Sequence, residues 1–307
     1  MKKNVLFLSL LVFLSGLSAT TIPSGYSVSE LGSFVTTSPG FGGLEADADG
    51  NVYMVGDYSD KVYKYNASNQ TFSQFCVTPS TNNLSVTLYN DYLYVGNNSG
   101  SIYKVNSSGS VSTFTTLSGT VNKMVLAPSG WGSYGNKMIT ATSNGLYSVD
   151  MNTGSINTII SGGIYDGIQF NSNNELLATK YDSNIYKISP TGSITSFFTI
   201  PGSADSIAIH PGTGEILTTA PNTTIYKTDA DGSNTTAFIT GLTISVGWYP
   251  SGIDFSPDGS TLYYSEINGN YKLYALTGFS TVNPVPEPST FFMAVIFVLL
   301  AAKVIRK

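Results

Sequence analysis

Reactive side chains are scarce in this sequence, which has one cysteine, Cys76, and one histidine, His210. One cysteine excludes an intramolecular disulfide. Any Ser–His or Cys–His catalytic pair would have to be built on one of these lone residues. We expect Cys76, in "FSQFCVTPS", to be a small buried hydrophobe, and His210, in "AIHPGTGE", to be a turn residue bonded to the local backbone.

Positive charge is also scarce, because the sequence has a single arginine, Arg306, near its end. The terminal segments hold five of the 14 basic residues, which leaves nine lysines in the body against 19 acids and a net charge of about −10. A body this acidic, without a guanidinium group, is poorly suited to bind phosphate or nucleic acid. Nucleic acid is therefore excluded as a partner.

Long amphipathic helices are not expected, because only 11 % of the residues are charged and Glu, Lys, Leu and Ala are sparse away from the ends. Gly, Ser, Thr, Asn and Tyr are abundant instead. Gly and Asn tolerate the positive φ that tight hairpins need, so this composition favours many short strands. The fold class predicted is all-β.

The first 19 residues predict a secretory signal peptide. Lys2 and Lys3 precede an apolar run from Val5 to Leu14, and small residues follow before Thr20. This order of basic, apolar and small residues is typical of a cleaved export signal. A retained membrane anchor is the weaker alternative, because the run is short.

The last segment, residues 284–307, carries a proline-rich tripeptide, an apolar run and a basic tip. The run from Phe291 to Ala302 has 12 residues, and a helix of that length spans about 18 Å, short of the roughly 30 Å hydrocarbon core of a membrane. The residues that define the pattern are Pro286, Glu287, Pro288, Lys303, Arg306 and Lys307.

This C-terminal pattern resembles the PEP-CTERM sorting signal of exported bacterial proteins. The resemblance implies a C-terminal hydrophobic helix in the membrane, cleavage by an exosortase-type sorting enzyme, and release of the body or its attachment to surface material. A simple tail anchor is the alternative. Either arrangement places the body outside the cytoplasmic membrane, at the cell surface or in the extracellular matrix.

Residues 20–283 repeat one pattern six times. Its clearest marker is an aliphatic–Tyr–Lys strand, and the six marker tyrosines, two of them in looser copies, are Tyr63, Tyr103, Tyr147, Tyr186, Tyr226 and Tyr274. Two strands precede each marker and a fourth follows most of them, which is the signature of a β-propeller blade. The sixth copy lacks a fourth strand, and residues 25–37 look like a fourth strand with nothing before it. We therefore predict a six-bladed propeller closed by its N-terminal strand.

The segments "GLEADADGNVYMV" and "GIDFSPDGSTLYYSE" resemble NHL-repeat and gluconolactonase-like propellers. That resemblance implies a Ca²⁺ site formed by Asn122, Asp166 and Asp205, with Glu45 as a further candidate ligand, in a lactonase-like hydrolase. Ser251 departs from the family pattern, which often has Asn there. No clear acid–base pair is visible beside the proposed ligands.

A second interpretation uses the aromatic residues expected at the same mouth: Tyr58, Tyr181, Trp248 and Tyr249. Sugar rings stack on such surfaces and bond to neighbouring amides and carboxylates. A third is that these are ordinary solvated loops. We expect a monomeric, non-enzymatic surface protein that serves as a scaffold or binds extracellular polysaccharide, with no cofactor. The calcium-dependent hydrolase is the alternative.

Overall fold

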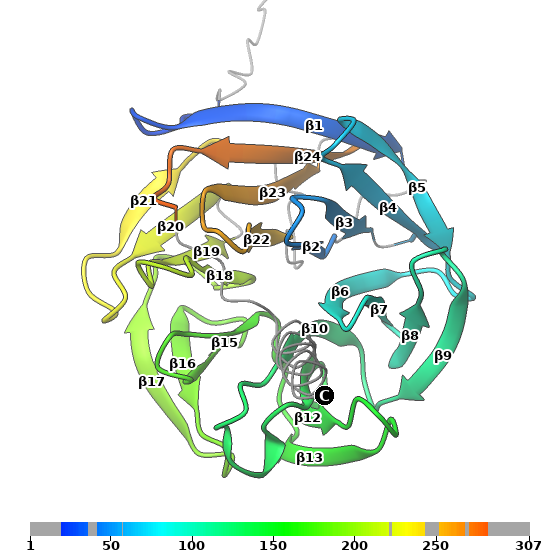
Figure 1. Ribbon diagram of the computed structural model, residues 1–307. Coiled ribbons are helices and arrows are strands. Elements are labelled where there is room, and N and C mark those ends of the chain that lie inside the picture. The colour runs from blue at the N-terminus through cyan, green and yellow to red at the C-terminus, as the bar shows by residue number, and fades with distance from the viewer. Residues whose placement is uncertain are drawn as a thin grey trace, which may run out of the picture.

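Six four-stranded antiparallel sheets form the blades of a closed ring (Figure 1). The computed structural model describes residues 20–35, 42–56, 58–220, 223–242, 252–267 and 270–281. The predicted all-β, six-bladed propeller is confirmed. In each blade the first strand lies nearest the axis of the ring and the fourth forms the outer rim.

Blades 1 to 3 follow the chain in order. Their strands are β2 (Leu44–Ala46), β3 (Val52–Val55), β4 (Lys61–Asn66) and β5 (Thr71–Val77); β6 (Asn83–Tyr89), β7 (Tyr92–Asn97), β8 (Ser101–Val105) and β9 (Val111–Thr116); and β10 (Val121–Leu126), β11 (Met138–Thr142), β12 (Gly145–Val149) and β13 (Ile156–Ser161). A short 3₁₀ helix, η1 (Gly132–Tyr134), lies between β10 and β11.

Blades 4 to 6 repeat the arrangement, and the last takes one strand from the start of the chain. Their strands are β14 (Ile168–Phe170), β15 (Leu176–Thr179), β16 (Asn184–Ile188) and β17 (Ile194–Thr199); β18 (Ile207–Ile209), β19 (Ile216–Ala220), β20 (Thr224–Thr228) and β21 (Thr236–Ile239); and β22 (Ile253–Phe255), β23 (Thr261–Ile267), β24 (Asn270–Thr277) and β1 (Ser27–Val35).

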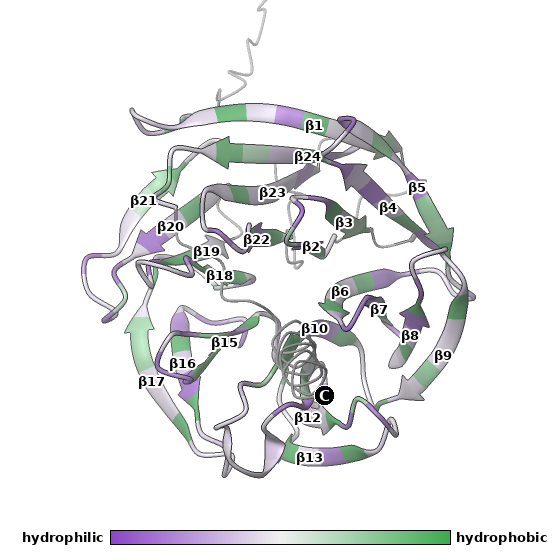
Figure 2. Cartoon of the chain, viewed as in Figure 1, coloured by the Kyte–Doolittle hydropathy of each residue, from purple (hydrophilic) through white to green (hydrophobic). Residues whose placement is uncertain are grey.

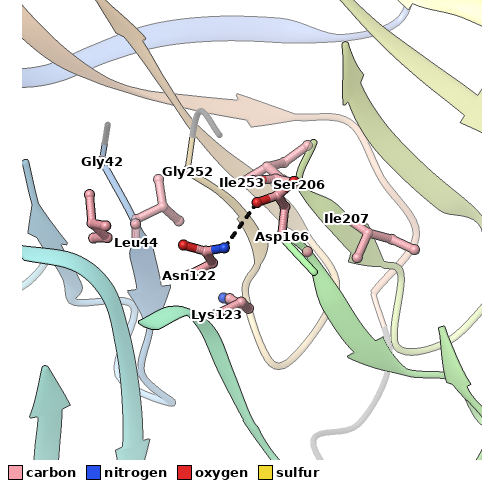
Figure 3. A pocket seen from close by; sticks show the side chains of 12 residues that line it. Gly42, Leu44, Asn122, Lys123, Asp166, Ser206, Ile207, Gly252 and Ile253 are labelled. Atoms are coloured by element: carbon pink, nitrogen blue, oxygen red, sulfur yellow. Dashed lines mark hydrogen bonds between the residues drawn. The ribbon is translucent and has the colours of Figure 1, made fainter. Parts of the chain in front are cut away.

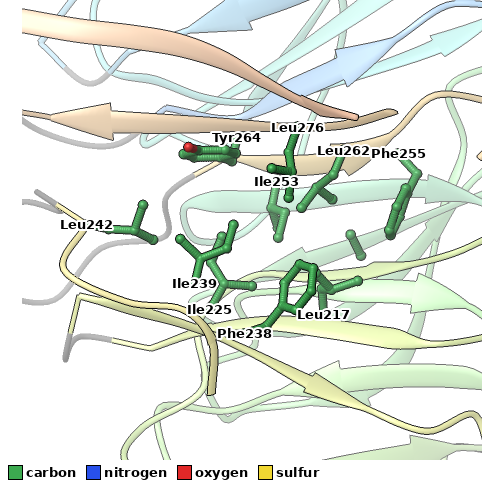
Figure 4. Close-up of a cluster of buried hydrophobic side chains, with 11 residues drawn as sticks. Leu217, Ile225, Phe238, Ile239, Leu242, Ile253, Phe255, Leu262, Tyr264 and Leu276 are labelled. Carbon is green, nitrogen blue, oxygen red and sulfur yellow. The ribbon is translucent and has the colours of Figure 1, made fainter. Parts of the chain in front are cut away.

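The hydrophobic core is divided among the six interfaces between adjacent blades. Second strands such as β11 are buried along their whole length, because each is covered on both faces by neighbouring blades. Fourth strands are more exposed, and β9 has no buried residue. Figure 2 shows bands of contrasting hydropathy along the rim. Figure 4 shows one interface, where Leu217 and Phe238 of blade 5 pack with Ile253 and Leu262 of blade 6.

The N-terminal strand closes the ring as predicted. β1 pairs antiparallel with β24, and Lys272 of β24 forms a 2.9 Å ion pair with Glu30 of β1. The ring of Phe34 stacks between those of Tyr63, at 4.0 Å, and Tyr271, at 4.9 Å. Closure therefore joins blade 6 to blade 1 through aromatic packing as well as backbone pairing.

The repeated marker coincides with a β-bulge. In five blades the register between the third and fourth strands shifts between the aliphatic residue and the tyrosine of the marker, and in the sixth it shifts opposite Leu273 and Tyr274. The residue skipped on the fourth strand is large and apolar every time: Leu31, Phe75, Phe114, Ile159, Phe197 and Phe238. A bulge bends and twists its strand, so the marker curves each outer strand around the rim.

Candidate functional site

The first strands of the blades line a central channel, which has a small cavity at the end where these strands begin. This mouth cavity encloses about 20 Å³, room for about one water molecule or a monatomic ion. All six blades contribute to its wall (Figure 3): Gly42, Gly43, Leu44, Leu84, Asn122, Lys123, Asp166, Gly167, Ser206, Ile207, Gly252 and Ile253.

Threonine hydroxyls at the ends of second strands hold the loops that lead into blades 4 and 5. Thr179 Oγ1 accepts a 2.7 Å hydrogen bond from the amide of Gly167, and Thr219 Oγ1 accepts one of 3.0 Å from Ser206. Thr179 Oγ1 also donates to the carbonyl oxygen of Asp205, which ties the two loops together. A Cβ on Gly167 would lie 2.6 Å from that carbonyl oxygen, so only glycine fits there.

Two of the predicted metal ligands are in direct contact. Nδ2 of Asn122 donates to Asp166 Oδ1 at 3.1 Å and to the carbonyl oxygen of Tyr165 at 2.8 Å. The amide oxygen of Asn122 is directed away from Asp166 (Figure 3). Asp205 is close enough for its charge to act on Asp166. The structure thus places Asn122, Asp166 and Asp205 near one another at one mouth of the channel, and their role as metal ligands stays a prediction.

Burial suppresses the ionisation of both aspartates. Asp166 is 1 % exposed and Asp205 is 4 % exposed. Burial raises the pKa of Asp166 to about 8, with a further contribution from the charge of Asp205, and burial raises the pKa of Asp205 to about 7. Oδ2 of Asp166 is buried without a hydrogen-bond partner among the described residues. Among the described residues no lysine forms an ion pair with either aspartate.

Tyr181 reaches this pair from the loop between β15 and β16. Its hydrogen bond to Asp166 lowers the pKa of that carboxyl and so opposes part of the effect of burial. Tyr181 and Tyr58 occupy the same turn in blades 4 and 1, and both have φ of 56°. Positive φ in a bulky residue costs about 1–3 kcal/mol and is found most often at functional sites. Tyr58 is 51 % exposed.

The other predicted site residues lie elsewhere or outside the described residues. Glu45 does not join the aspartates: it lines a different cavity at the far end of the channel. Trp248 and Tyr249 lie outside the described residues, as do the signal peptide and the sorting-signal residues Pro286, Glu287, Pro288, Lys303, Arg306 and Lys307. Among the residues that are described, no helix is both long and apolar enough to cross a membrane.

The far cavity, of about 130 Å³, contains a charged group that the sequence analysis did not predict. Lys123 Nζ lies 3.6 Å from Glu45 Oε2, and Asp254 faces the same cavity while accepting a 3.1 Å hydrogen bond from the amide of Ala46. Burial raises the pKa of Glu45 to about 7, although Lys123 opposes the shift. Glu45 and Asp254 both occupy the middle position of a three-residue first strand, which is the sequence signal that could have paired them.

Cys76 and His210 have the structural roles predicted for them. Cys76 is buried, and burial raises the pKa of its thiol to about 11, so it stays protonated. Nδ1 of His210 accepts hydrogen bonds from the amides of Gly212 and Thr213, and Nε2 lies 3.0 Å from the carbonyl oxygen of Ser280. His210 therefore fastens the end of the described chain to blade 5.

Comparison with known proteins identifies the architecture. No protein-family model and no curated protein sequence matches this chain. Among solved structures, the chain is similar to a gluconolactonase from Xanthomonas campestris, with a TM-score of 0.62, 10 % identity and coverage of 82 % of this chain and 89 % of that one. Regucalcin, a calcium-binding protein from Agrobacterium tumefaciens, has a TM-score of 0.62, 15 % identity and coverage of 83 % and 97 %. Virginiamycin B lyase from Staphylococcus aureus has a TM-score of 0.59 and 17 % identity, with coverage of 82 % of this chain and 99 % of that one.

The fold is shared. These proteins are six-bladed propellers like this chain, but identities this low do not carry an activity from one protein to another. The neighbours differ among themselves, since they include a lactonase, a lyase and a calcium-binding protein. A function for this chain has to be argued from its own mouth cavity.

Proposed function

We propose that the protein is an exported binding protein that holds a carbohydrate ligand at the mouth of its channel, without catalysing a reaction on it. The observation that carries the proposal is that Asn122 and Asp166 line the mouth cavity, with Asp205 and Tyr181 acting on Asp166 from beside it. Within the described residues Asp166 Oδ2 has no hydrogen-bond partner. Amide and carboxyl groups bond to sugar hydroxyls, and tyrosine rings offer flat apolar faces.

The mouth residues fit a hard divalent cation such as Ca²⁺. Ca²⁺ takes carboxylate and amide oxygens as ligands, and the oxygens that could hold it here belong to Asp166 and Asp205. Asn122 would add its oxygen only by turning its amide over, since Nδ2 donates to Asp166 in this structure. Within the described ranges no three His, Cys, Asp or Glu residues form a metal-binding group, so further ligands would come from the main chain, water or the carbohydrate. When bound, the ion would neutralise the carboxylate pair and could coordinate sugar hydroxyls.

The mouth cavity is too small to enclose a ligand larger than an ion or a water molecule. At about 20 Å³ it accommodates an ion or a water but not a lactone ring. A carbohydrate would instead rest on the rim, where Tyr58 is exposed and Tyr181 is half-buried. A rim site can bind one unit of a long polysaccharide without enclosing it.

Hydrolysis of a lactone or other ester is the second candidate, and the carboxyl pair is the observation that favours it. The pKa of Asp205 is raised to about 7, which suits a general base working at neutral pH. In that case a divalent cation would polarise the carbonyl group and Asp205 would accept a proton from water.

The two candidates separate in one set of measurements. The purified protein is titrated with Ca²⁺ while its melting temperature is followed, then tested on a lactone panel and on a glycan array. The variants are Asp166→Asn with Asp205→Asn, and, as the control, Asp150→Asn, a half-buried aspartate whose carboxylate accepts hydrogen bonds from the amides of its own turn. Glycan binding without turnover supports the proposal. Turnover that disappears in the double variant but not in the control would establish the hydrolase.

Export rests on the two terminal segments, which also imply the sorting enzyme as a partner. Mass spectrometry of the mature protein should find an N-terminus near Ala19 and no peptide beyond about Ser289. An intact basic tip recovered from membranes would favour plain anchoring. Recovery of the whole chain from the cytoplasm would contradict export.

A further inference from the structure

Lys180 carries a positive charge next to the proposed site. It follows β15 directly and precedes Tyr181, whose side chain bonds to Asp166. Four other described lysines form ion pairs with glutamates: Lys123, Lys187, Lys227 and Lys272. Within the described residues Lys180 has no such carboxylate partner, and its side chain is half-buried rather than free in solvent.

Two tyrosine rings hold the ammonium group of Lys180. Its Nζ lies 5.2 Å from the ring centroid of Tyr165 and 5.2 Å from that of Tyr186. Both are within the range of cation–π attraction. Tyr165 is 1 % exposed, and the hydroxyl of Tyr186 donates to Asp182 Oδ2 at 2.7 Å. Because both rings are fixed, the ammonium group is positioned before any ligand arrives.

The same contacts connect Lys180 to the mouth cavity. Tyr165 precedes Asp166 in the chain, and its carbonyl oxygen accepts the hydrogen bond from Asn122. Asp166 and Lys180 are therefore parts of one local structure, built from the loop before β14 and the loop after β15.

We propose that Lys180 recognises a carboxylate on the bound carbohydrate, so that the ligand is an acidic sugar such as a uronate unit. This inference rests on the proposed function, since it names the class of ligand for the same site. The ammonium group would donate hydrogen bonds to the carboxylate, and the half-buried ring of Tyr186 would lie beside the sugar. A single ammonium without arginine neighbours suits a monoanionic carboxylate better than a phosphate, which usually draws several donors.

The acidic residues around Lys180 leave its ammonium group available to a ligand carboxylate. Asp182 accepts hydrogen bonds from Tyr186 and from the amide of Asn184, and it is not among the described ion pairs with lysine. The aspartate pair at the mouth would repel an acidic ligand when ionised and would attract it through a bound cation. Binding is therefore measured both with Ca²⁺ and with a chelator.

The test uses trigalacturonate, an acidic trisaccharide, and trigalactose, its neutral counterpart, with the full-length protein. The variants are Lys180→Gln and, as a matched control, Lys104→Gln. Lys104 also faces two tyrosine rings, with Nζ 3.8 Å from the ring centroid of Tyr92 and 5.9 Å from that of Tyr94, but lies on the third strand of blade 2. Calorimetry gives the dissociation constants, and melting temperatures verify folding.

The parent protein should bind trigalacturonate more tightly than trigalactose. Lys180→Gln should weaken trigalacturonate binding about tenfold and leave trigalactose unchanged, since a hydrogen bond to a charged group contributes about that much. Lys104→Gln should change neither. If Lys180→Gln does not fold, the parent is measured at rising salt, and only its trigalacturonate affinity should fall.

The possible failures are distinguishable. Equal affinity of the parent for both sugars, or no effect of Lys180→Gln, overturns the role of Lys180 while the carbohydrate site stands. Absence of binding to any sugar, here and on the glycan array, overturns the proposed function and this inference with it.

Discussion

The substitution Asp166→Asn should make the protein less sensitive to rising pH. Asn keeps the size of the side chain and an oxygen that can accept the hydrogen bond from Tyr181, but it cannot ionise. In the folded protein the pKa of Asp166 is raised from 3.8 to about 8. The unfolded chain therefore releases this proton as pH rises above about 4, while the folded protein keeps it until about 8. Stability is lost over that whole window.

The size of the effect follows from linkage. Within the window one proton is held only by the folded state, so the free energy of unfolding falls by about 1.4 kcal/mol per pH unit. Between pH 5 and pH 7 Asp166 accounts for about 2.7 kcal/mol, as an upper limit because water entering the site would weaken the shift. For a domain of this size that corresponds to about 5–10 °C in melting temperature.

The assay is the melting temperature at pH 5, 6 and 7, in a chelator, for the parent, Asp166→Asn and Asp150→Asn. Glu45, Asp254 and Asp205 also have raised pKa values. They therefore contribute to the slope of the parent's melting temperature against pH. The informative quantity is the difference in slope between the parent and Asp166→Asn. Asp150 has a lowered pKa because backbone amides and Thr153 donate to it, so its removal should leave the slope unchanged.

Ca²⁺ supplies the second half of the same prediction. An ion held by the ionised pair should raise the melting temperature of the parent, most at pH 7, and should do little for Asp166→Asn. Identical slopes for the parent and Asp166→Asn would refute the reasoning that Asp166 is held protonated by its surroundings.

Three further substitutions should lower stability, each measured by urea unfolding. Phe34→Ala removes the ring stacked between Tyr63 and Tyr271 at the ring closure and should cost about 3–5 kcal/mol. A smaller loss than for an average core leucine would contradict closure by β1. Gly167→Ala places a Cβ 2.6 Å from the carbonyl oxygen of Asp205 and should cost about 1–3 kcal/mol, whereas Ala at Gly130, where nothing lies within 4 Å, should be neutral. His210→Ala removes the contact with the Ser280 carbonyl and should cost about 1–3 kcal/mol.

Blade number and ring closure were predictable because they follow from short-range patterns. The aliphatic–Tyr–Lys marker recurs once in each blade, so counting the markers gives the number of blades. The sixth copy lacks a fourth strand, and the extra strand at the start of the sequence supplies it. The bulge beside each marker tyrosine was not predictable in the same way. It depends on which residue of the fourth strand, such as Phe75 or Phe114, has no partner on the third strand. The sequence around a turn does not determine the pairing register of the two strands that it joins.

The contact between Asn122 and Asp166 could be anticipated because equivalent positions in a propeller converge on its axis. Asp166 and Asp205 are one repeat apart in adjacent blades and precede their first strands in the same way. What the pattern could not provide was their environment. Burial to 1 % and 4 % exposure depends on Gly167, on the hydroxyl of Thr179 and on the width of the channel, which are set by packing between blades.

Glu45 shows where reasoning from equivalent positions reaches its limit. Glu45 lies one residue after the start of its first strand, whereas Asp166 lies two residues before the start of its own. The two positions therefore differ by three residues, or about 10 Å along an extended strand, which places Glu45 at a different level of the channel. There it meets Lys123 from blade 3 and Asp254 from blade 6. The channel thus has acidic side chains at two places, the mouth cavity and the far cavity, and they differ in whether a lysine neutralises the negative charge. Lys123 offsets the acids of the far cavity, whereas the acids of the mouth have no described ammonium group in ion-pair contact. That difference, rather than the number of carboxylates, is why the mouth is the better candidate for binding a cation.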